Sequence, residues 1–274
     1  MLDLITPVIL TRNEAPNIGR TLERLWWAKR VVVLDSYSTD ATRDIADAFP
    51  NVDFHQRAFD AHARQWNVAI HEIVFQENAW ILALDADYQV SEELVQEMAK
   101  LRPDAGIVGY VARFRYCIGG RPLRGTLYPD KVVLFRRAHG RYIQDGHTQA
   151  LTIEGRLGIL RNPIDHDDRK PLSHWLGAQD HYMRLEADHL LTTPWGMLSW
   201  PDRLRRLYLV VPLLAFVHCL IFKRGFLDGR AGWYYACQRT LSELLLSLRL
   251  LERRLALDAE PPDALPHQRP PTRA

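Results

Sequence analysis

The stretch Trp80-Ile-Leu-Ala-Leu-Asp-Ala-Asp, residues 80 to 87, decides the fold class. Five apolar residues are followed at once by acidic ones, which is typical of a buried strand ending at a polar edge of a sheet. Residues 6 to 10 and 30 to 34 are also short apolar runs, each followed by a polar turn and a stretch with helical spacing. This alternation predicts an α/β domain around a parallel sheet. Because ligands of such sheets bind beyond the carboxyl ends of the strands, the polar residues after each run form the candidate site.

The pattern changes after residue 106. Residues 107 to 116, 131 to 136 and 150 to 153 are predicted strands that continue the sheet as a mixed one, while Ser91 is a predicted N-cap for a helix that starts with two glutamates. Further helices are expected at 172 to 190 and 230 to 257. We therefore expect a domain over 1–170, with halves 1–105 and 106–170, then a helical region over 171–258 and a proline-rich disordered tail over 259–274.

The composition excludes several classes of protein. Of 274 residues, 47% are hydrophobic, and 35 Lys and Arg stand against 33 Asp and Glu, which lies in the ordinary globular range and excludes collagen-like and wholly disordered chains. Cys117, Cys219 and Cys237 lie far apart without CxxC spacing. We therefore expect free or buried thiols, a reducing compartment and no structural zinc site.

The basic charge is concentrated near the carboxyl end, where residues 203 to 258 hold ten Lys and Arg against four Asp and Glu. Residues 207 to 222 in this region carry no charge apart from His218. As a helix they would reach only ~24 Å, short of the ~30 Å hydrocarbon core, so a simple membrane span is not expected. The flanking residues are Trp195, Trp200, Arg203, Arg205, Arg206, Lys223 and Arg224. Basic and aromatic flanks predict a segment that lies in, or dips into, an anionic membrane surface, with no nucleic-acid partner. A buried core helix or a subunit interface is the alternative.

Asp85 and Asp87 are the strongest chemical signal. Side chains two residues apart at the end of a strand point to the same side, so two carboxylates there can converge on one divalent cation and a diphosphate. The simpler interpretation is a polar strand exit before a helix. An aspartyl phosphatase of the haloacid dehalogenase type also places DxD after a strand, but it requires Thr or Val where this chain has Gln89, and it uses the first strand rather than the fourth.

Three motifs in order resemble one family. They are Ile9-Leu-Thr-Arg-Asn-Glu, Val33-Leu-Asp-Ser-Tyr-Ser-Thr-Asp-Ala-Thr and Leu84-Asp-Ala-Asp. Together they are similar to the signatures of family 2 inverting glycosyltransferases with the GT-A fold, a Rossmann-like α/β fold. Two later stretches, Tyr128-Pro-Asp-Lys-Val-Val-Leu-Phe-Arg-Arg and Lys223-Arg-Gly-Phe-Leu-Asp-Gly-Arg-Ala-Gly, are similar to the bacterial branch that glucosylates the lipopolysaccharide inner core.

The resemblance implies roles for residues near the nucleotide. Thr11, Asn13 and Glu14 match the turn that holds the nucleotide, and Asp35 matches the acid that hydrogen-bonds the base. A carboxylate only accepts hydrogen bonds, which suits the N3–H of uracil. Asp40 matches a further motif acid, although it can equally cap a helix. Arg64 and Asn67 match the helix that lines the donor site, with a solvated helix face as the alternative for Arg64.

The resemblance also implies a metal and a general base. Asp85 is expected to reach ribose or sugar and Asp87 to bind Mg²⁺ or Mn²⁺, with Asp85 as a further metal ligand. The segment Asp165-His166-Asp167-Asp168-Arg169-Lys170 is too dense in polar groups for an ordinary loop, and from this we expect His166 to complete the metal shell. Arg169 or its neighbour Lys170 is expected to neutralise the leaving diphosphate. The base for an acceptor hydroxyl is Asp145 or, because this chain departs from the family's pattern here, His147. The alternative for Asp145 and His147 is a glycine-containing turn, and the alternative for His166 and Arg169 is an acidic turn that caps a helix.

The expected function is transfer of glucose or a similar hexose from a nucleotide diphosphate donor, UDP-linked, to a hydroxyl of a lipid-linked saccharide. We expect this at the cytoplasmic face of the bacterial inner membrane, with a peripheral or monotopic attachment. One alternative is transfer to polyprenyl phosphate. The other is a membrane-bound interaction module whose GT-A half is inactive.

Overall fold

A computed structural model describes residues 1–75, 79–104, 106–145 and 148–255. The chain divides into two compact units, one made of Met1–Trp175 and Val217–Ala236, the other of Leu176–Phe216 and the chain from Cys237 onward. The segment Val217–Ala236, which we expected to belong to the helical region, is thus part of the first unit. The predicted disordered tail lies outside the described residues.

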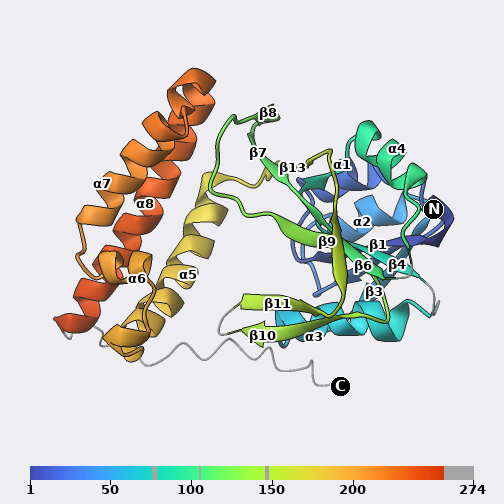
Figure 1. Ribbon diagram of the computed structural model, residues 1–274, viewed down its shortest axis with the longest axis horizontal. Coiled ribbons are helices and arrows are strands. Elements are labelled where there is room, and N and C mark those ends of the chain that lie inside the picture. The colour runs from blue at the N-terminus through green and yellow to red at the C-terminus, as the bar shows by residue number, and fades with distance from the viewer. Residues whose placement is uncertain (76–78, 105, 146–147, 256–274) are drawn as a thin grey trace, which may run out of the picture. The chain divides into compact units, whose positions relative to one another are not determined.

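The first unit is built on a seven-stranded mixed sheet (Figure 1), with the strand order β12-β6-β9-β4-β1-β2-β3. Its strands are β1 (Ile5–Thr11), β2 (Val31–Asp35), β3 (Val52–Gln56), β4 (Trp80–Asp85), β6 (Ile107–Ala112), β9 (Lys131–Arg136) and β12 (Arg156–Ile159). Strands β4, β1, β2 and β3 are parallel, whereas β9 runs antiparallel to both β4 and β6. The sheet therefore confirms the predicted mixed α/β fold. The carboxyl ends of its parallel strands meet at one edge.

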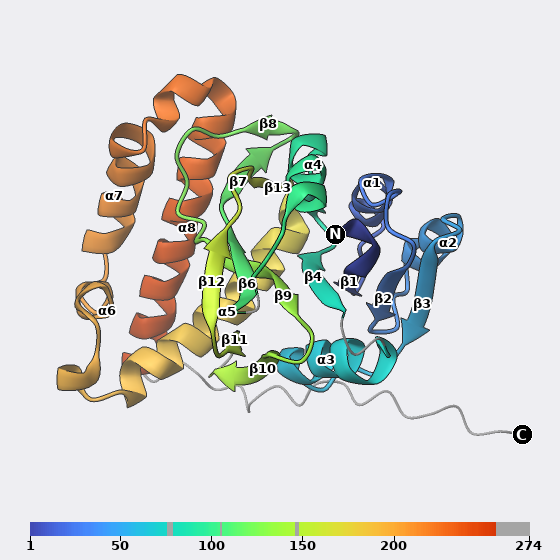
Figure 2. The ribbon, with the colours of Figure 1, turned by 45° about the vertical axis from the view of Figure 1, so that its right-hand side comes forward.

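Helices cover both faces of this sheet (Figure 2). They are α1 (Ile18–Glu23), α2 (Thr42–Asp47), α3 (His62–Val68), which continues as the π-helical turn η2 (Ala69–Ile73), and α4 (Glu92–Lys100). One core joins α1, α2 and α4 to the alternate strand residues that include Ile9 and Val33. The other joins α3 and η2 to the intervening residues, such as Val8 and Val32. Burial on both faces explains why β1, β2 and β4 are continuous apolar runs.

Two smaller sheets follow. A hairpin of β10 (Gly140–Asp145) and β11 (Thr148–Ile153) is one of them. The other has the order β5-β13-β7-β8, with β5 (Tyr88–Gln89), β13 (Ile164–His166), β7 (Phe114–Ile118) and β8 (Arg121–Pro122). Pairing of β13 with β5 sets His166 opposite Tyr88, one residue after the second aspartate of the DxD motif.

The single strand predicted over 107–116 was wrong. The chain leaves the large sheet after Ala112, and β7 joins β13 instead. Other local predictions are confirmed, since the Ser91 hydroxyl accepts a hydrogen bond from the amide of Leu94 and so caps α4. None of the three cysteines, all of which lie in the described chain, forms a disulfide; Cys117 and Cys219 are buried and Cys237 is exposed.

The remaining helices come after residue 171. They are α5 (Leu172–Thr192), η3 (Trp195–Met197), α6 (Trp200–Arg205), α7 (Val210–Val217), the π-helical turn η4 (His218–Phe222), η5 (Gly225–Asp228) and α8 (Gly229–Arg254). The second unit has its own small core, which includes Leu190, Leu198 and Leu246. Within the described chain no single helix is long and apolar enough to cross a membrane. The pair Val210–Phe222 and Gly225–Arg254, bent by 66°, meets the length and composition required.

Candidate active site

Asp35 organises the loop that follows β2. It is fully buried, and the four acceptor positions of its carboxylate receive hydrogen bonds from the Thr11 hydroxyl (2.8 Å), the amide and hydroxyl of Ser38, and the Gln56 side chain (3.3 Å). A nucleobase contact at Asp35 would therefore replace one of these bonds. The bond from Gln56 is the longest of them.

Asn13 and Glu14 lie in the turn after β1, as expected. Asn13 adopts a left-handed backbone, with φ of 54°, and its side-chain oxygen accepts a hydrogen bond from the amide of Thr39. Asp40 binds the amides of Ala15 and Thr42, so it joins the same two loops. These side chains hold the β1 and β2 loops together at the carboxyl edge.

A buried polar network joins the first loop to the chain after β13. The Lys170 ammonium donates to Glu14 at 2.6 Å, and Asn17 donates to Glu14 and to Asp168. Burial opposes the charge on Lys170, but the carboxylate of Glu14 outweighs it and raises the pKa of Lys170. Arg169, the expected diphosphate ligand, instead pairs with Asp167 at 2.8 Å. Lys170 is thus a cation next to the turn after β1, and the negative charge of Asp87 further raises the pKa of Lys170.

Asp87 and His166 form a close pair. The Nε2 atom of His166 lies 3.0 Å from Oδ2 of Asp87, and both side chains are about 15% exposed. Burial opposes both charges, but each partner stabilises the other, so the pKa of Asp87 is lowered and that of His166 is raised. Oδ1 of Asp87 and Nδ1 of His166 are buried and have no hydrogen-bond partner among the described residues. Aspartate and histidine are residue types that ligate divalent cations, but here their near atoms Oδ2 and Nε2 bond to each other, so a cation would have to take the place of the proton between them and the metal site stays a prediction.

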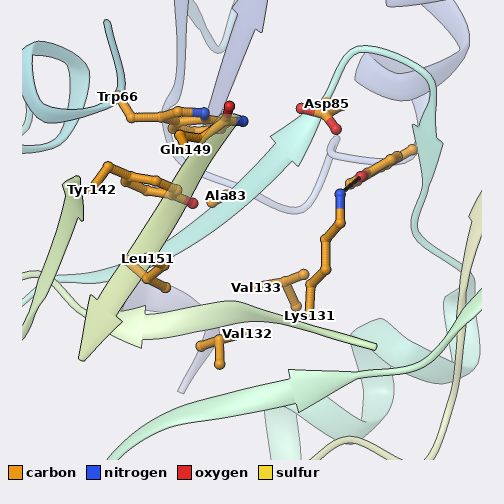
Figure 3. Close-up of a pocket in the computed structure, with 10 residues that line it drawn as sticks. Trp66, Ala83, Asp85, Lys131, Val132, Val133, Tyr142, Gln149 and Leu151 are labelled. Carbon is orange, nitrogen blue, oxygen red and sulfur yellow. Dashed lines mark hydrogen bonds between the residues drawn. The ribbon is translucent and has the colours of Figure 1, made fainter. Parts of the chain in front are cut away.

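Asp85 faces a different way. Over the part of the chain that the structure describes, no three His, Cys, Asp or Glu side chains gather as a metal-binding group. Asp85 instead lines a pocket of about 280 Å³ beyond the end of β4. Figure 3 shows Asp85 and Lys131 on one side of this pocket, with Trp66 and Tyr142 on the other. The convergence of Asp85 and Asp87 on one ion is not seen in this arrangement.

The aromatic rings of Trp66 and Tyr142 stack with centroids 5.1 Å apart. Gln149 and Leu151 of β11 complete that side of the pocket. An apolar wall that carries the Gln149 amide and faces a carboxylate and an ammonium is suited to a sugar, which presents apolar faces and many hydroxyls.

Lys131 is a site residue that sequence reasoning missed. Its ammonium donates to the hydroxyls of Tyr88 (2.9 Å) and Tyr128 (2.8 Å). The Tyr128 ring lies 4.6 Å from that of His166, centroid to centroid. The quoted stretch from Tyr128 to Arg137 contains Lys131, but a single lysine in a strand does not show that it bonds to Tyr88, which lies in a strand of another sheet.

The structure does not bring Arg64 and Asn67 into the pocket. Arg64 is 71% exposed at its side chain and pairs with Asp60, which is the solvated helix face given above as the alternative. The Asn67 amide makes two hydrogen bonds with the backbone of Tyr142, so it fixes β10 to α3. Both remain predicted substrate ligands without a contact that supports the role.

The predicted base lies on the hairpin. Asp145 ends β10, and its backbone pairs with Thr148. The same hairpin contributes Tyr142 and Gln149 to the pocket. His147 lies outside the described residues.

The family model for glycosyl transferase family 2 matches residues 6–159, which include the carboxyl edge, Asp85 and Asp87. The chain belongs to this family and is a glycosyltransferase. It is 24% identical over 277 residues to the lipopolysaccharide core biosynthesis glycosyltransferase LpsC of Rhizobium meliloti, covering 96% of this chain and 98% of the relative. An uncharacterized glycosyltransferase of Rickettsia felis is 32% identical over 102 residues, 35% of this chain and 33% of its own.

Two solved structures are partly similar. TarS 1-349 of S. aureus has a TM-score of 0.44 and 15% identity, and covers 92% of this chain and 91% of its own. Glucosyl-3-phosphoglycerate synthase from Mycobacterium tuberculosis, in complex with Mn²⁺, UDP and glucosyl-3-phosphoglycerate, has a TM-score of 0.33 and 18% identity. It covers 42% of this chain and 44% of its own.

Proposed function

We propose that this glycosyltransferase moves a hexose such as glucose from a UDP-linked donor to a hydroxyl of a lipid-linked saccharide of the lipopolysaccharide core type. The observation that carries the proposal is the pocket at the end of β4, where Asp85 lies beside the buried pair of Asp87 and His166. Similarity to LpsC along nearly the whole chain, named for lipopolysaccharide core biosynthesis, supports the acceptor class.

In this proposal Asp87 and His166 hold Mg²⁺ or Mn²⁺, which, when bound, neutralises charge on the donor diphosphate. Asp85 accepts hydrogen bonds from the sugar or the ribose, and the Trp66–Tyr142 wall packs against an apolar sugar face. Lys170 adds a positive charge near the nucleotide turn. The nucleobase is bound at Asp35, where the N3–H of uracil donates to the carboxylate in place of the long hydrogen bond from Gln56.

Asp145 is the proposed general base, with His147 as the other candidate. The acceptor oxygen bonds to the anomeric carbon as the bond from that carbon to the phosphate oxygen breaks. The hydroxyl proton passes to the carboxylate, and the bonding electrons leave with the diphosphate. Asp145→Asn should therefore lower turnover ~100-fold or more while donor affinity stays nearly unchanged. Retained transfer to polyprenyl phosphate, an already anionic acceptor, would favour that alternative.

We further propose that the enzyme acts at the cytoplasmic face of the bacterial inner membrane. Leu213, Leu214 and Phe222 are 68%, 51% and 73% exposed, which is unusual for an apolar helix packed in a core. The role predicted for the arginines needs revision, because Arg205 pairs with Glu186, Asp202 and Glu243 inside the second unit. The apolar side chains, rather than this arginine, are therefore the proposed lipid contacts.

The test is incubation of the purified full-length protein with labelled nucleotide sugars, Mg²⁺ or Mn²⁺, and bacterial lipids. Transfer of label to a lipid-linked saccharide supports the proposal, and label on polyprenyl phosphate supports the alternative acceptor. A protein that binds UDP but transfers nothing to any acceptor would instead be an interaction module.

A further inference from the structure

The stretch Lys223-Arg-Gly-Phe-Leu-Asp-Gly-Arg-Ala-Gly forms a tight turn, η5 and the start of α8, that the proposed chemistry does not use. A Cβ atom on Gly232 would lie 1.8 Å from the carbonyl oxygen of Gly225, so only glycine allows the turn to close. Arg224 enters the turn with a left-handed φ of 57°. The turn belongs to the first unit.

This turn holds the loop that precedes β9, residues 123 to 130, which we call the β9 loop. The nearly buried side chain of Asp228, 7% exposed, accepts a hydrogen bond from the amide of Arg124 at 3.0 Å and pairs with its guanidinium at 3.2 Å. The hydroxyl of Tyr235 accepts a hydrogen bond from the amide of Leu127 at 2.9 Å. Two backbone amides of an otherwise irregular loop are thus anchored by side chains 104 and 108 residues further along the chain.

The contact is close as well as polar. A Cβ atom on Gly125 would lie 2.5 Å from the carbonyl oxygen of Lys223, so the loop backbone lies directly on the turn. The ring of Tyr235 also packs against Tyr116, at 5.2 Å between centroids, and Tyr116 packs against His166 at 4.8 Å.

The β9 loop leads directly into the site. Tyr128 lies in the loop and Lys131 is the first residue of β9. Tyr128 packs on His166, and Lys131 joins the hydroxyls of Tyr128 and Tyr88 beside Asp85. A shift of the loop would therefore move both side chains away from the pair and the pocket.

We propose that the turn of residues 223–232 is a clamp for the β9 loop, and that Asp228 is a positioning residue that keeps Tyr128 and Lys131 over the reaction site. The inference rests on the proposed function for its effect on turnover, but the clamp itself is a property of the fold. It gives a mechanical role to a motif that lies 136 to 145 residues beyond Asp87 in the chain.

The test uses the full-length chain with Asp228→Ala, Asp228→Asn and Gly125→Ala. Asp228→Ala should lower kcat ~10-fold or more, because small displacements of site groups reduce turnover strongly, while UDP affinity stays within about twofold. Asp228→Asn keeps an acceptor for the Arg124 amide and should restore part of kcat. Gly125→Ala pushes the loop off the turn without touching Asp228 and should reproduce the loss.

Hydrogen exchange gives a readout that is independent of activity. The amides of Arg124 and Leu127 should exchange at least ~10-fold faster in Asp228→Ala, while the strands of the large sheet keep their protection. Asp53→Ala is the matched control, since it also removes a carboxylate paired with an arginine, Arg30, but near the amino end of β3. It should alter neither kcat nor exchange in the β9 loop.

Wild-type exchange and wild-type kcat in Asp228→Ala would overturn the clamp. So would a loss of protection spread over the whole sheet in Asp228→Asn and Gly125→Ala, because Asp228 would then be a general stability residue. If the wild-type enzyme shows no transfer activity, the proposed function is refuted. If the loop amides still exchange faster in Asp228→Ala than in the wild type, the clamp is supported all the same.

Discussion

At the scale of single residues, Asp87 and His166 carry most of the chemistry that we propose. Each has one buried polar atom without a hydrogen-bond partner among the described residues, and the pair lies at the end of β4. In the proposed site, a cation would take the place of the proton between Oδ2 of Asp87 and Nε2 of His166 and so gain a carboxylate and an imidazole ligand. Arg64 and Arg169, which we expected to bind the donor phosphates, are paired with Asp60 and Asp167 instead.

Asp87→Ala should abolish metal-dependent transfer, with a loss of ~1,000-fold or more in kcat/KM, because the carboxylate cannot be replaced from the described neighbours. Binding of Mn²⁺ in the presence of UDP, measured by calorimetry, should disappear in parallel. The variant should stay folded but melt at a lower temperature, because among the described residues His166 is the one side chain at hydrogen-bond distance from this carboxylate and loses that partner while it stays buried. Near-normal turnover in this variant would exclude Asp87 as a metal ligand.

At the scale of elements, the hairpin β10–β11 is held to α3 by Asn67, whose amide makes two hydrogen bonds with the backbone of Tyr142. The hairpin carries Tyr142, Gln149 and the proposed base Asp145. Its position relative to Asp85 therefore depends on these two bonds.

Asn67→Ala should lower the free energy of unfolding by ~1–3 kcal/mol, because a buried backbone amide and carbonyl lose their partner. It should also lower kcat by shifting the hairpin, with UDP affinity preserved. Chemical denaturation and donor titration measure the two effects. If UDP binding is lost while stability is unchanged, Asn67 is a substrate ligand, as the family resemblance implies.

Glu97 on α4 joins the helix to the chain before β13. Its carboxylate accepts hydrogen bonds from the amides of Arg161 (2.8 Å) and Asn162 (3.0 Å) and from the Asn162 side chain. Burial opposes the charge, but these bonds outweigh it and lower the pKa of Glu97. They stabilise β13 and hence the position of His166.

A group whose pKa is lowered on folding stabilises the protein above its unfolded pKa and loses this effect as the pH falls through its folded pKa. Glu97→Gln should therefore destabilise the protein by ~1 kcal/mol near neutral pH, after allowance for solvent screening, and by less at pH 3. Thermal melts of both proteins between pH 3 and 7 measure the difference. If the difference in melting temperature between the two proteins stays constant with pH, the charge of Glu97 does not contribute to stability.

The strands whose two faces are both buried could be predicted from sequence, because apolar runs such as Val31–Asp35 are unambiguous. The short strands could not. Arg156–Ile159 and Ile164–His166 have mixed composition and exist because partners elsewhere in the chain, β6 and β5, offer hydrogen bonds. Since β13 sets His166 beside Asp87, the strand pattern could not predict this pairing, and the only sign of it in the sequence was the dense polar composition of residues 165 to 170.

The directions of the two DxD side chains could not be predicted from the sequence either. Strand alternation put Asp85 and Asp87 on one side, but β4 ends at Asp85 and β5 begins at Tyr88, so alternation no longer holds across the motif. Asp87 therefore faces His166 while Asp85 faces the pocket. The sequence motif identified both carboxylates, but the turn between β4 and β5 determines that the two side chains face different groups.

At the scale of the whole molecule, net charge is a weak guide to where the protein acts. The basic excess of residues 203 to 258 suggested an electrostatic contact with anionic lipid. In the second unit, however, Arg206 donates to the carbonyl of Leu190, and Arg205 is surrounded by carboxylates. The exposed apolar residues of α7 and η4 are a better candidate for membrane contact.

We predict that the full-length protein floats with liposomes containing anionic lipid, and that it does so through apolar burial more than through charge. Replacing Leu213, Leu214 and Phe222 with Gln should lower the bound fraction at least ~10-fold, because each side chain contributes ~1.5–3 kcal/mol when it is buried in the membrane interface. Arg203, Arg205 and Arg206 changed to Gln should instead lower the melting temperature, with a smaller effect on flotation.

The matched control places Gln at three exposed apolar residues outside α7 and η4, Trp26, Phe75 and Ile159, which are 78%, 75% and 73% exposed. Flotation of this control should equal that of the wild type, which ties lipid binding to the apolar residues of α7 and η4 rather than to general hydrophobicity. High salt separates the two forces, because it screens charge but not apolar burial. A protein that stays lipid-free at low and high salt would refute the membrane proposal. If high salt releases the protein from the liposomes completely, the arginines rather than the apolar side chains make the lipid contact.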